Sequence, residues 1–96
     1  MKILITYDVN TETKKGQKRL RSVAQACKNY GQRVQKSVFE CSLDNVKFEK
    51  LRKRFFEIID EDKDSLRIYR LIGEREKYVE VIGIDNYIDF DAPLIM

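Results

Sequence analysis

The chain has 96 residues and a mass of 11.4 kDa, which provides for one hydrophobic core and one domain. Hydrophobic residues make up 43% and charged residues 36%, a composition typical of a globular protein and not of a disordered or collagen-like one. The sequence has no histidine, so Ser-His-Asp and Cys-His catalysis and any site built on imidazole are excluded. Carboxylates and bound metal must then perform any acid-base chemistry.

Residue spacing excludes further classes of binding site and of protein. Cys27 and Cys41 form no CxxC pair, so we predict two small buried hydrophobic residues and not a zinc knuckle or a thioredoxin motif. The four glycines are too dispersed for a dinucleotide fingerprint or a Walker loop. No apolar run approaches the roughly 18 residues of a membrane span, and Met1-Lys2 leads into a strand pattern with no cleavable signal. We therefore expect a cytoplasmic protein.

Charge is divided unevenly along the chain. Residues 1–59 carry 14 Lys and Arg against 6 Asp and Glu, a net +8, whereas residues 60–96 carry 5 against 10, a net −5. A basic N-terminal part indicates a polyanionic partner, because Lys and Arg near phosphates release counterions. The alternative is an ordinary solvated surface.

The first half of the chain predicts a strand, a helix and two extended segments. Residues 2–9 form a short apolar run typical of a buried central strand that ends at Asp8. A helix follows, with Thr11 or Thr13 as its cap and Gly31 as its C′ terminator. Its apolar positions are Leu20, Val23, Ala24, Cys27 and Tyr30. Residues 32–35 and 37–43 predict either a hairpin or one long bent strand.

The second half predicts another helix and two more strands. Asp44 is a good N-cap for a helix whose apolar stripe is Phe48, Leu51, Phe55, Ile58 and Ile59. Residues 66–72 alternate as a strand, residues 73–77 form a charged turn, and residues 78–82 are predicted to be one more strand. The tail, residues 83–96, carries more apolar side chains than a free terminus should expose.

This order of elements predicts an α+β domain over residues 1–96. It is the ferredoxin-like split βαβ arrangement, βαββαβ, with an additional C-terminal strand. Both helices should cover one face of an antiparallel sheet and leave the other face bare. A bare face beside an apolar tail favours a two-fold homodimer.

Asp8 is the main candidate for chemistry, because it is an acid at the end of an otherwise apolar strand. The alternative is a purely structural role, in which Asp8 caps the following turn. Mg²⁺ prefers hard oxygen ligands and keeps several waters, so few carboxylates are needed to hold it. If the two-fold axis brings both Asp8 side chains together, the pair can share a metal that acts on a phosphodiester.

Cations crowd the start of the first helix, where the helix dipole already disfavours positive charge. They are Lys14, Lys15, Lys18, Arg19 and Arg21. A bound phosphate would neutralise this repulsion, so the start of the helix is a candidate anion site. Arg33 can reach the same region. The alternative is a set of solvated side chains, which is also our interpretation of a separate basic patch on the second helix, Lys50, Arg52, Lys53 and Arg54.

Three strand residues have two interpretations each. Tyr7 and Phe39 either stack on nucleic-acid bases or belong to the core, as aromatic residues on strands usually do. Ser37 is either a hydroxyl near a phosphate or metal, or an ordinary strand residue. With no base nearby, it is a poor nucleophile.

Several segments together resemble the CRISPR-associated protein 2 family. They are Leu4-Ile5-Thr6-Tyr7-Asp8-Val9, Lys18-Arg19-Leu20-Arg21, residues 30–41 (YGQRVQKSVFEC) and Asp64-Ser65-Leu66-Arg67-Ile68-Tyr69. The resemblance spans most of the chain, and the first strand and the RVQxSVFEC segment are specific in combination.

The resemblance implies a ferredoxin-like homodimer that works in CRISPR adaptation, bound between copies of the integrase subunit. It also implies Mg²⁺-dependent endonuclease activity on RNA or double-stranded DNA, with Asp8 as metal ligand. The positions that match the family's active-site cleft are Tyr7, Arg19, Arg33, Ser37 and Phe39. The tail is expected to pack on the partner subunit.

Three functional hypotheses follow. The first is a metal-dependent phosphodiesterase in which Lys18, Arg19 and Arg33 neutralise the phosphate. The second is a non-catalytic dimeric scaffold whose basic surfaces clamp a DNA duplex and whose tail docks the integrase subunit. The third and weakest is a ferredoxin-like module that binds RNA or senses a ligand, because a pair of base-stacking aromatics on a central strand is not evident.

Overall fold

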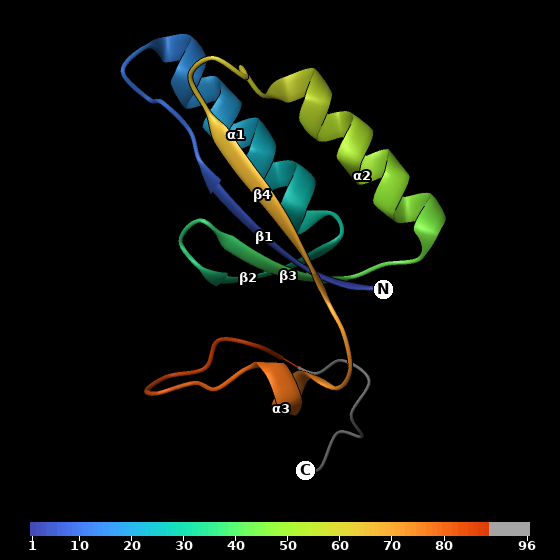
Figure 1. Ribbon diagram of the computed structural model, residues 1–96. Coiled ribbons are helices and arrows are strands. Elements are labelled where there is room, and N and C mark those ends of the chain that lie inside the picture. The colour runs from blue at the N-terminus through green and yellow to red at the C-terminus, as the bar shows by residue number, and fades with distance from the viewer. Residues whose placement is uncertain (89–96) are drawn as a thin grey trace.

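The computed structural model describes residues 1–88, and its helices and strands follow the predicted order (Figure 1). In chain order they are β1 (Lys2–Asp8), α1 (Lys14–Lys28), β2 (Gly31–Gln35), β3 (Val38–Ser42), α2 (Asn45–Ile58), β4 (Ser65–Leu71) and α3 (Arg75–Tyr78). The run from β1 to β4 is the split βαβ order expected from the hydrophobic pattern.

The four strands form one antiparallel sheet with the order β2-β3-β1-β4. β1 lies inside the sheet, where Ile5 is opposite Phe39 of β3 on one side and Ile68 of β4 on the other. The continuous apolar run of β1 follows from this position, because an inner strand is flanked by protein on both edges. The prediction of a central first strand is confirmed.

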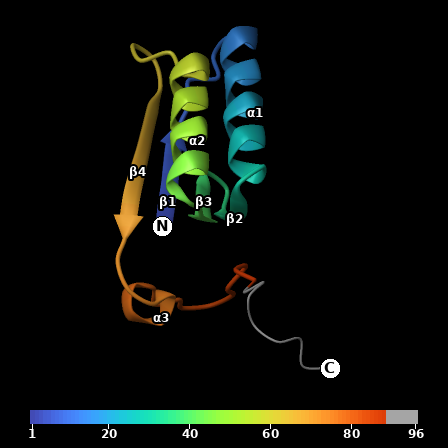
Figure 2. The same cartoon turned by 90° about the vertical axis from the view of Figure 1, so that its right-hand side faces the viewer.

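Both long helices cover the same face of the sheet, and they lie side by side there (Figures 1 and 2). Successive strand residues point to opposite faces, so Ile3, Ile5 and Tyr7 of β1 face the helices and are buried. The core is completed by residues of α1, α2, β3 and the loops, namely Val9, Val23, Ala26, Cys27, Phe39, Cys41, Leu43, Phe48, Leu51 and Phe55. We call the opposite side of the sheet the open face; it carries Leu4, Thr6 and Asp8.

The two predicted helix caps are confirmed. The Thr13 hydroxyl accepts a hydrogen bond from the Gly16 amide at 3.0 Å, and the Asp44 carboxylate accepts one from the Lys47 amide at 2.8 Å. Each cap satisfies a first-turn N–H that has no partner within its helix. Of the two possible caps for α1, Thr13 is the one used.

The extended segments after α1 form a hairpin and not one bent strand. β2 and β3 pair in antiparallel register across a turn at Lys36 and Ser37, with an irregularity between Arg33 and Gln35. Cys27 and Cys41 are free and buried, as predicted, and burial raises the pKa of each thiol to about 12.

Gly31 is not the helix terminator that the sequence predicts. α1 ends at Lys28 with Asn29 as a right-handed cap, and the only glycines with positive φ among residues 1–88 are Gly73 and Gly83. Gly31 instead begins β2 at a point where the chain passes close to β3. A Cβ there would collide with Cys41 Sγ and lie 2.5 Å from the Glu40 carbonyl oxygen.

Gly31→Ala is therefore expected to destabilise the fold by about 1–3 kcal/mol, because the backbone of β3 must move to admit one methyl group. Chemical denaturation followed by circular dichroism measures the change. Gln35→Ala, an exposed position on the same strand, is the control and should stay within about 0.5 kcal/mol of wild type. Equal stability of the two variants would contradict the packing argument.

The predicted strand over residues 78–82 is wrong. Gly73, at φ 93°, turns the chain after β4, and α3 then takes up Arg75–Tyr78 in place of the predicted turn. Residues 79–88 form no strand: they lie against the open face, near Leu4 and Val38. Their contacts with the edge strand β2 use the side chains of Gln32 and Asn86 and do not form a backbone ladder. None of the helices within residues 1–88 is long and apolar enough to span a membrane.

Candidate functional site

Asp8 is the last residue of β1, and its side chain is exposed on the open face. It lies opposite Ser65, the first residue of β4. The apolar run of β1 positions this acid, because alternation places its neighbour Tyr7 in the core and leaves Asp8 on the face that no long helix covers.

Tyr7, Arg33 and Phe39 form a cluster on the helix side of the sheet. The rings of Tyr7 and Phe39 are stacked with centroids 6.3 Å apart, and the Arg33 guanidinium lies 5.2 Å from the Phe39 centroid. Burial raises the pKa of the Tyr7 phenol, although a hydrogen bond with Arg33 acts to lower it, so the phenol stays protonated at neutral pH. Tyr7 and Phe39 are core residues, which agrees with the structural interpretation of these aromatics.

Ser37 lies in the β2–β3 turn and joins this cluster through a small surface cavity of about 430 Å³. Tyr7, Arg21 and Arg33 also line this cavity. The Ser37 carbonyl accepts a hydrogen bond from the Tyr7 amide at 3.2 Å, so the turn holds the backbone one residue before Asp8. Arg21, Arg33 and Ser37 therefore line one cavity, on the side of the sheet opposite Asp8.

Arg19 is paired with Asp64, a residue that the sequence did not single out as functional. Arg19 Nε lies 2.8 Å from Asp64 Oδ2, and the Asp64 side chain is 0% exposed. Asp64 also accepts the amides of Asn10 and Asp60, at 3.0 and 3.1 Å. Burial acts to raise the pKa of Asp64, but these three donors outweigh it and hold the pKa below its ordinary value. No local signal marks this pair, because 45 positions separate its members.

The two long helices form a strongly basic layer. α1 contains six Lys and Arg and no acid, and α2 contains five against two, so the helices carry a net +9 while the whole chain carries +3. Lys14, Lys15, Lys18 and Arg21 are exposed on α1. Both helices lie on the face of the sheet opposite the one to which alternation assigns Asp8 (Figure 2), so the exposed cations of the helices belong to the helix side of the molecule.

The segment after α3 is held on the sheet by a second arginine that the sequence analysis did not identify. Arg75 forms a bidentate ion pair with Glu40, at 2.9 and 3.0 Å, and also pairs with Asp85 at 3.2 Å. The Gln32 side-chain amide also donates a hydrogen bond to the Ile88 carbonyl at 2.7 Å and accepts one from the Ile88 amide at 2.8 Å. Residues 85–88 thus contact their own chain. The rest of the predicted tail, residues 89–96, lies outside the described residues, so its packing on a partner stays a prediction.

Asp8 has too few neighbouring ligands in one chain to hold a metal alone. Within residues 1–88 no group of three or more Cys, Asp or Glu side chains is placed to bind an ion. The donor itself fits Mg²⁺, since it is an exposed carboxylate with room for metal-bound waters. A magnesium site at Asp8 therefore requires oxygens from outside the chain.

The fold and these sites define a class: a small split βαβ protein with a lone acid at the end of its first strand and a basic helical layer. Comparison with known sequences identifies the family. The family described as "CRISPR associated protein Cas2" matches residues 1–78. The chain belongs to this family.

Relatives and solved structures agree with this assignment. The chain is 60% identical over the full length of both proteins to "CRISPR-associated endoribonuclease Cas2 1" of Moorella thermoacetica. It is 55% identical to "CRISPR-associated endonuclease Cas2" of Halalkalibacterium halodurans, over 99% of each protein. The crystal structure of Streptococcus pyogenes Cas2 at pH 6.5 matches 86% of this chain and 100% of that one, with 53% identity and a TM-score of 0.77.

Proposed function

We propose that this protein is a Mg²⁺-dependent endonuclease of CRISPR adaptation that hydrolyses phosphodiester bonds of RNA or double-stranded DNA. The observation that carries the proposal is Asp8, an exposed carboxylate on an open sheet face with no other acid cluster among residues 1–88 to complete a metal site. The names of the relatives, endoribonuclease and endonuclease, support a nuclease.

The active form is a ferredoxin-like homodimer in which the open faces meet. Two Asp8 carboxylates, one from each subunit, would then hold Mg²⁺, which when bound lowers the pKa of a coordinated water and stabilises charge on the phosphate. The chain's own part is to fix both carboxylates at strand ends and to keep them accessible to a nucleic-acid strand. Exposed open-face residues such as Tyr69, 43% exposed, offer apolar surface for the dimer contact.

The test compares wild-type protein with Asp8→Asn on labelled RNA and labelled duplex DNA, in Mg²⁺ and after chelation. Cleavage that needs both Mg²⁺ and Asp8 supports the proposal. Cleavage that continues in the chelated sample would overturn it.

A second function, a non-catalytic DNA-binding scaffold for the CRISPR integrase subunit, is favoured by the basic helical layer. Its net charge of +9 lies on the side of the sheet opposite Asp8, so a duplex can bind there without entering the acidic site. The family's proposed partner, the integrase subunit, would then use the dimer as a platform.

Replacing Lys14, Lys15 and Lys18 by Gln is expected to weaken duplex binding for any sequence and to flatten the dependence of log K on log salt by about one unit for each lost phosphate contact. Arg19 is left intact because it is paired with Asp64. The matched control replaces Lys2, Lys63 and Lys77, which changes the net charge equally. If the slope of log K against log salt decreases equally in both triple variants, the total charge and not the α1 surface governs binding.

A further inference from the structure

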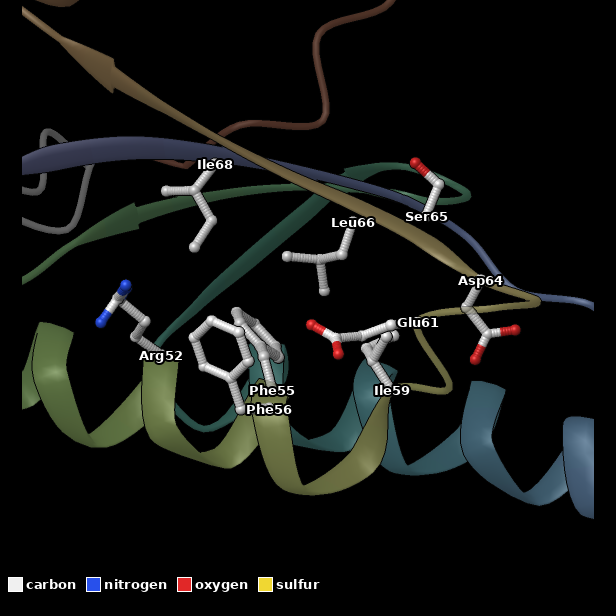
Figure 3. A pocket seen from close by; sticks show the side chains of 9 residues that line it. All are labelled: Arg52, Phe55, Phe56, Ile59, Glu61, Asp64, Ser65, Leu66 and Ile68. Atoms are coloured by element: carbon white, nitrogen blue, oxygen red, sulfur yellow. The ribbon is translucent and has the colours of Figure 1, made fainter.

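A groove between α2 and β4 is not explained by either function. It has a volume of about 450 Å³ and lies on the helix side of the sheet, along the outermost strand. In Figure 3 Leu66 and Ile68 point from β4 toward Phe55, Phe56 and Ile59 on and after α2. These five apolar side chains form the middle of the groove, and four polar or charged ones, Arg52, Glu61, Asp64 and Ser65, complete its lining.

The two phenylalanines that line the groove differ in burial. Phe55 is 4% exposed and belongs to the core, but its neighbour Phe56 is 62% exposed at the mouth of the groove. Leu66 and Ile68 are only partly buried. An exposed phenyl ring beside two half-buried aliphatic residues is apolar surface that a ligand can cover.

β4 also offers backbone hydrogen-bonding groups along the groove. Among residues 1–88 it pairs only with β1, so the outer edge of its seven residues has no strand partner. An extended peptide can add to such an edge through main-chain hydrogen bonds, while alternate side chains enter the neighbouring pockets.

The two ends of the groove differ in charge: Glu61 and Asp64 lie at one end, and Arg52 lies at the other, where an acidic side chain of a peptide can be placed. The Arg52 guanidinium lies 5.2 Å from the centroid of Phe56, and that of Arg70 lies 5.2 Å from the centroid of Phe48, so both cations stand along the α2–β4 seam. The only ion pair described for Arg52 among residues 1–88 is an exposed contact to Glu49 at 3.9 Å, which holds it weakly. Basic side chains at an edge discourage pairing with a neutral or basic strand and favour an acidic one.

We propose that the α2–β4 groove binds an extended peptide of a partner protein that adds to β4 as a fifth strand, with apolar side chains against Phe56, Leu66 and Ile68 and an acidic side chain beside Arg52 and Arg70. Side chains two positions apart share a face of a strand, so the apolar and acidic residues of the peptide alternate with residues that face away. The groove lies on the helix side, away from the open face, so the inference does not depend on the proposed nuclease or its dimer contact.

The test is an array of labelled octapeptides in which threonine alternates with leucine, aspartate or lysine in all combinations, incubated with the full-length protein. Peptides that combine leucine with aspartate should bind saturably, and their lysine counterparts should bind at least about tenfold more weakly, since a charge reversal beside two arginines changes the sign of the interaction. No saturable binding, or a preference for lysine, would overturn the proposal.

Variants and a modified peptide locate the binding. Phe56→Ala and Arg52→Glu should each weaken the best peptide at least about fivefold, whereas the matched control Lys53→Glu, on the same helix, should not. N-methylation of alternate peptide amides should abolish binding if main-chain hydrogen bonds are used. Binding that survives N-methylation, or that responds equally to Lys53→Glu, would exclude addition to β4. Duplex binding measured on the same variants reports separately on the proposed function.

Discussion

Asp8→Asn is expected to lower Mg²⁺-dependent cleavage by roughly 100-fold or more, while the protein remains folded. The substitution removes the negative charge that binds a hard cation but keeps the size and shape of the side chain. Asp8 is exposed and forms no described ion pair within residues 1–88, so its loss removes no structural contact. Single-turnover cleavage of labelled RNA and duplex DNA measures the rate, and thermal unfolding verifies the fold.

Glu12→Gln is the matched control, because Glu12 is an exposed acid four residues further along the chain and loses the same charge. Its cleavage rate should equal that of wild type. An Asp8→Asn protein that cleaves at the wild-type rate would remove the catalytic proposal and leave only the scaffold.

Mixed dimers test whether both carboxylates act together. If the two Asp8 side chains share one metal, a dimer of one wild-type and one Asp8→Asn subunit should be nearly as inactive as the double variant. Half of the wild-type rate would instead indicate two independent sites. Spacer integration by the same proteins, with the integrase subunit added, then separates catalysis from scaffolding: the scaffold function predicts no loss.

The sequence predicted the parts of the fold that local patterns determine. β1, the apolar faces of both long helices and the caps at Thr13 and Asp44 each depend on residues within a few positions of one another. Gly31 was misinterpreted because its role depends on Cys41, a contact across the sheet. The strand predicted over residues 78–82 has strand-like residues, but a strand also requires backbone pairing with a neighbouring strand, and the sequence alone does not show whether that pairing forms.

In the candidate site, too, local patterns predict some features, and contacts between distant residues determine the others. The position of Asp8 follows from the end of one apolar run, whereas the separation of Asp8 from Tyr7, Arg33 and Phe39 follows from strand alternation and became clear only with the register. Adjacent residues of a strand are close along the chain but face opposite sides. The Arg19–Asp64 pair joins α1 to the start of β4 and needed the complete fold to be seen.

Asp64→Ala is expected to destabilise the fold by about 3 kcal/mol, because it removes the acceptor of three donors from a buried position. The Arg19 guanidinium would lose its partner, and the amides of Asn10 and Asp60 would lose theirs. Urea denaturation at pH 7 measures the difference from wild type. Asp62→Ala, an exposed acid in the same loop, is the control and should change the unfolding free energy by less than about 0.5 kcal/mol.

The pH dependence of stability tests the charge of Asp64 separately. Its pKa in the folded protein lies below its ordinary value, so the folded state binds the proton less tightly than the unfolded state does. The carboxylate therefore contributes its full stabilisation above the unfolded pKa of about 3.9, and this contribution is lost as the pH falls through the folded pKa. The gap in unfolding free energy between wild type and Asp64→Asn should be constant from about pH 7 to 5 and should narrow below about pH 4. A gap that widens in acid would contradict the pairing with Arg19.

A double-mutant cycle with Arg19→Gln assigns the effect to the pair. If the guanidinium and the carboxylate stabilise each other, the two substitutions together should cost less than the sum of each alone, by at least about 0.5 kcal/mol. Strict additivity would mean that Asp64 acts through the backbone amides of Asn10 and Asp60 alone. In that case Arg19 would be available to a phosphate, and its predicted place in the nucleic-acid surface would be strengthened.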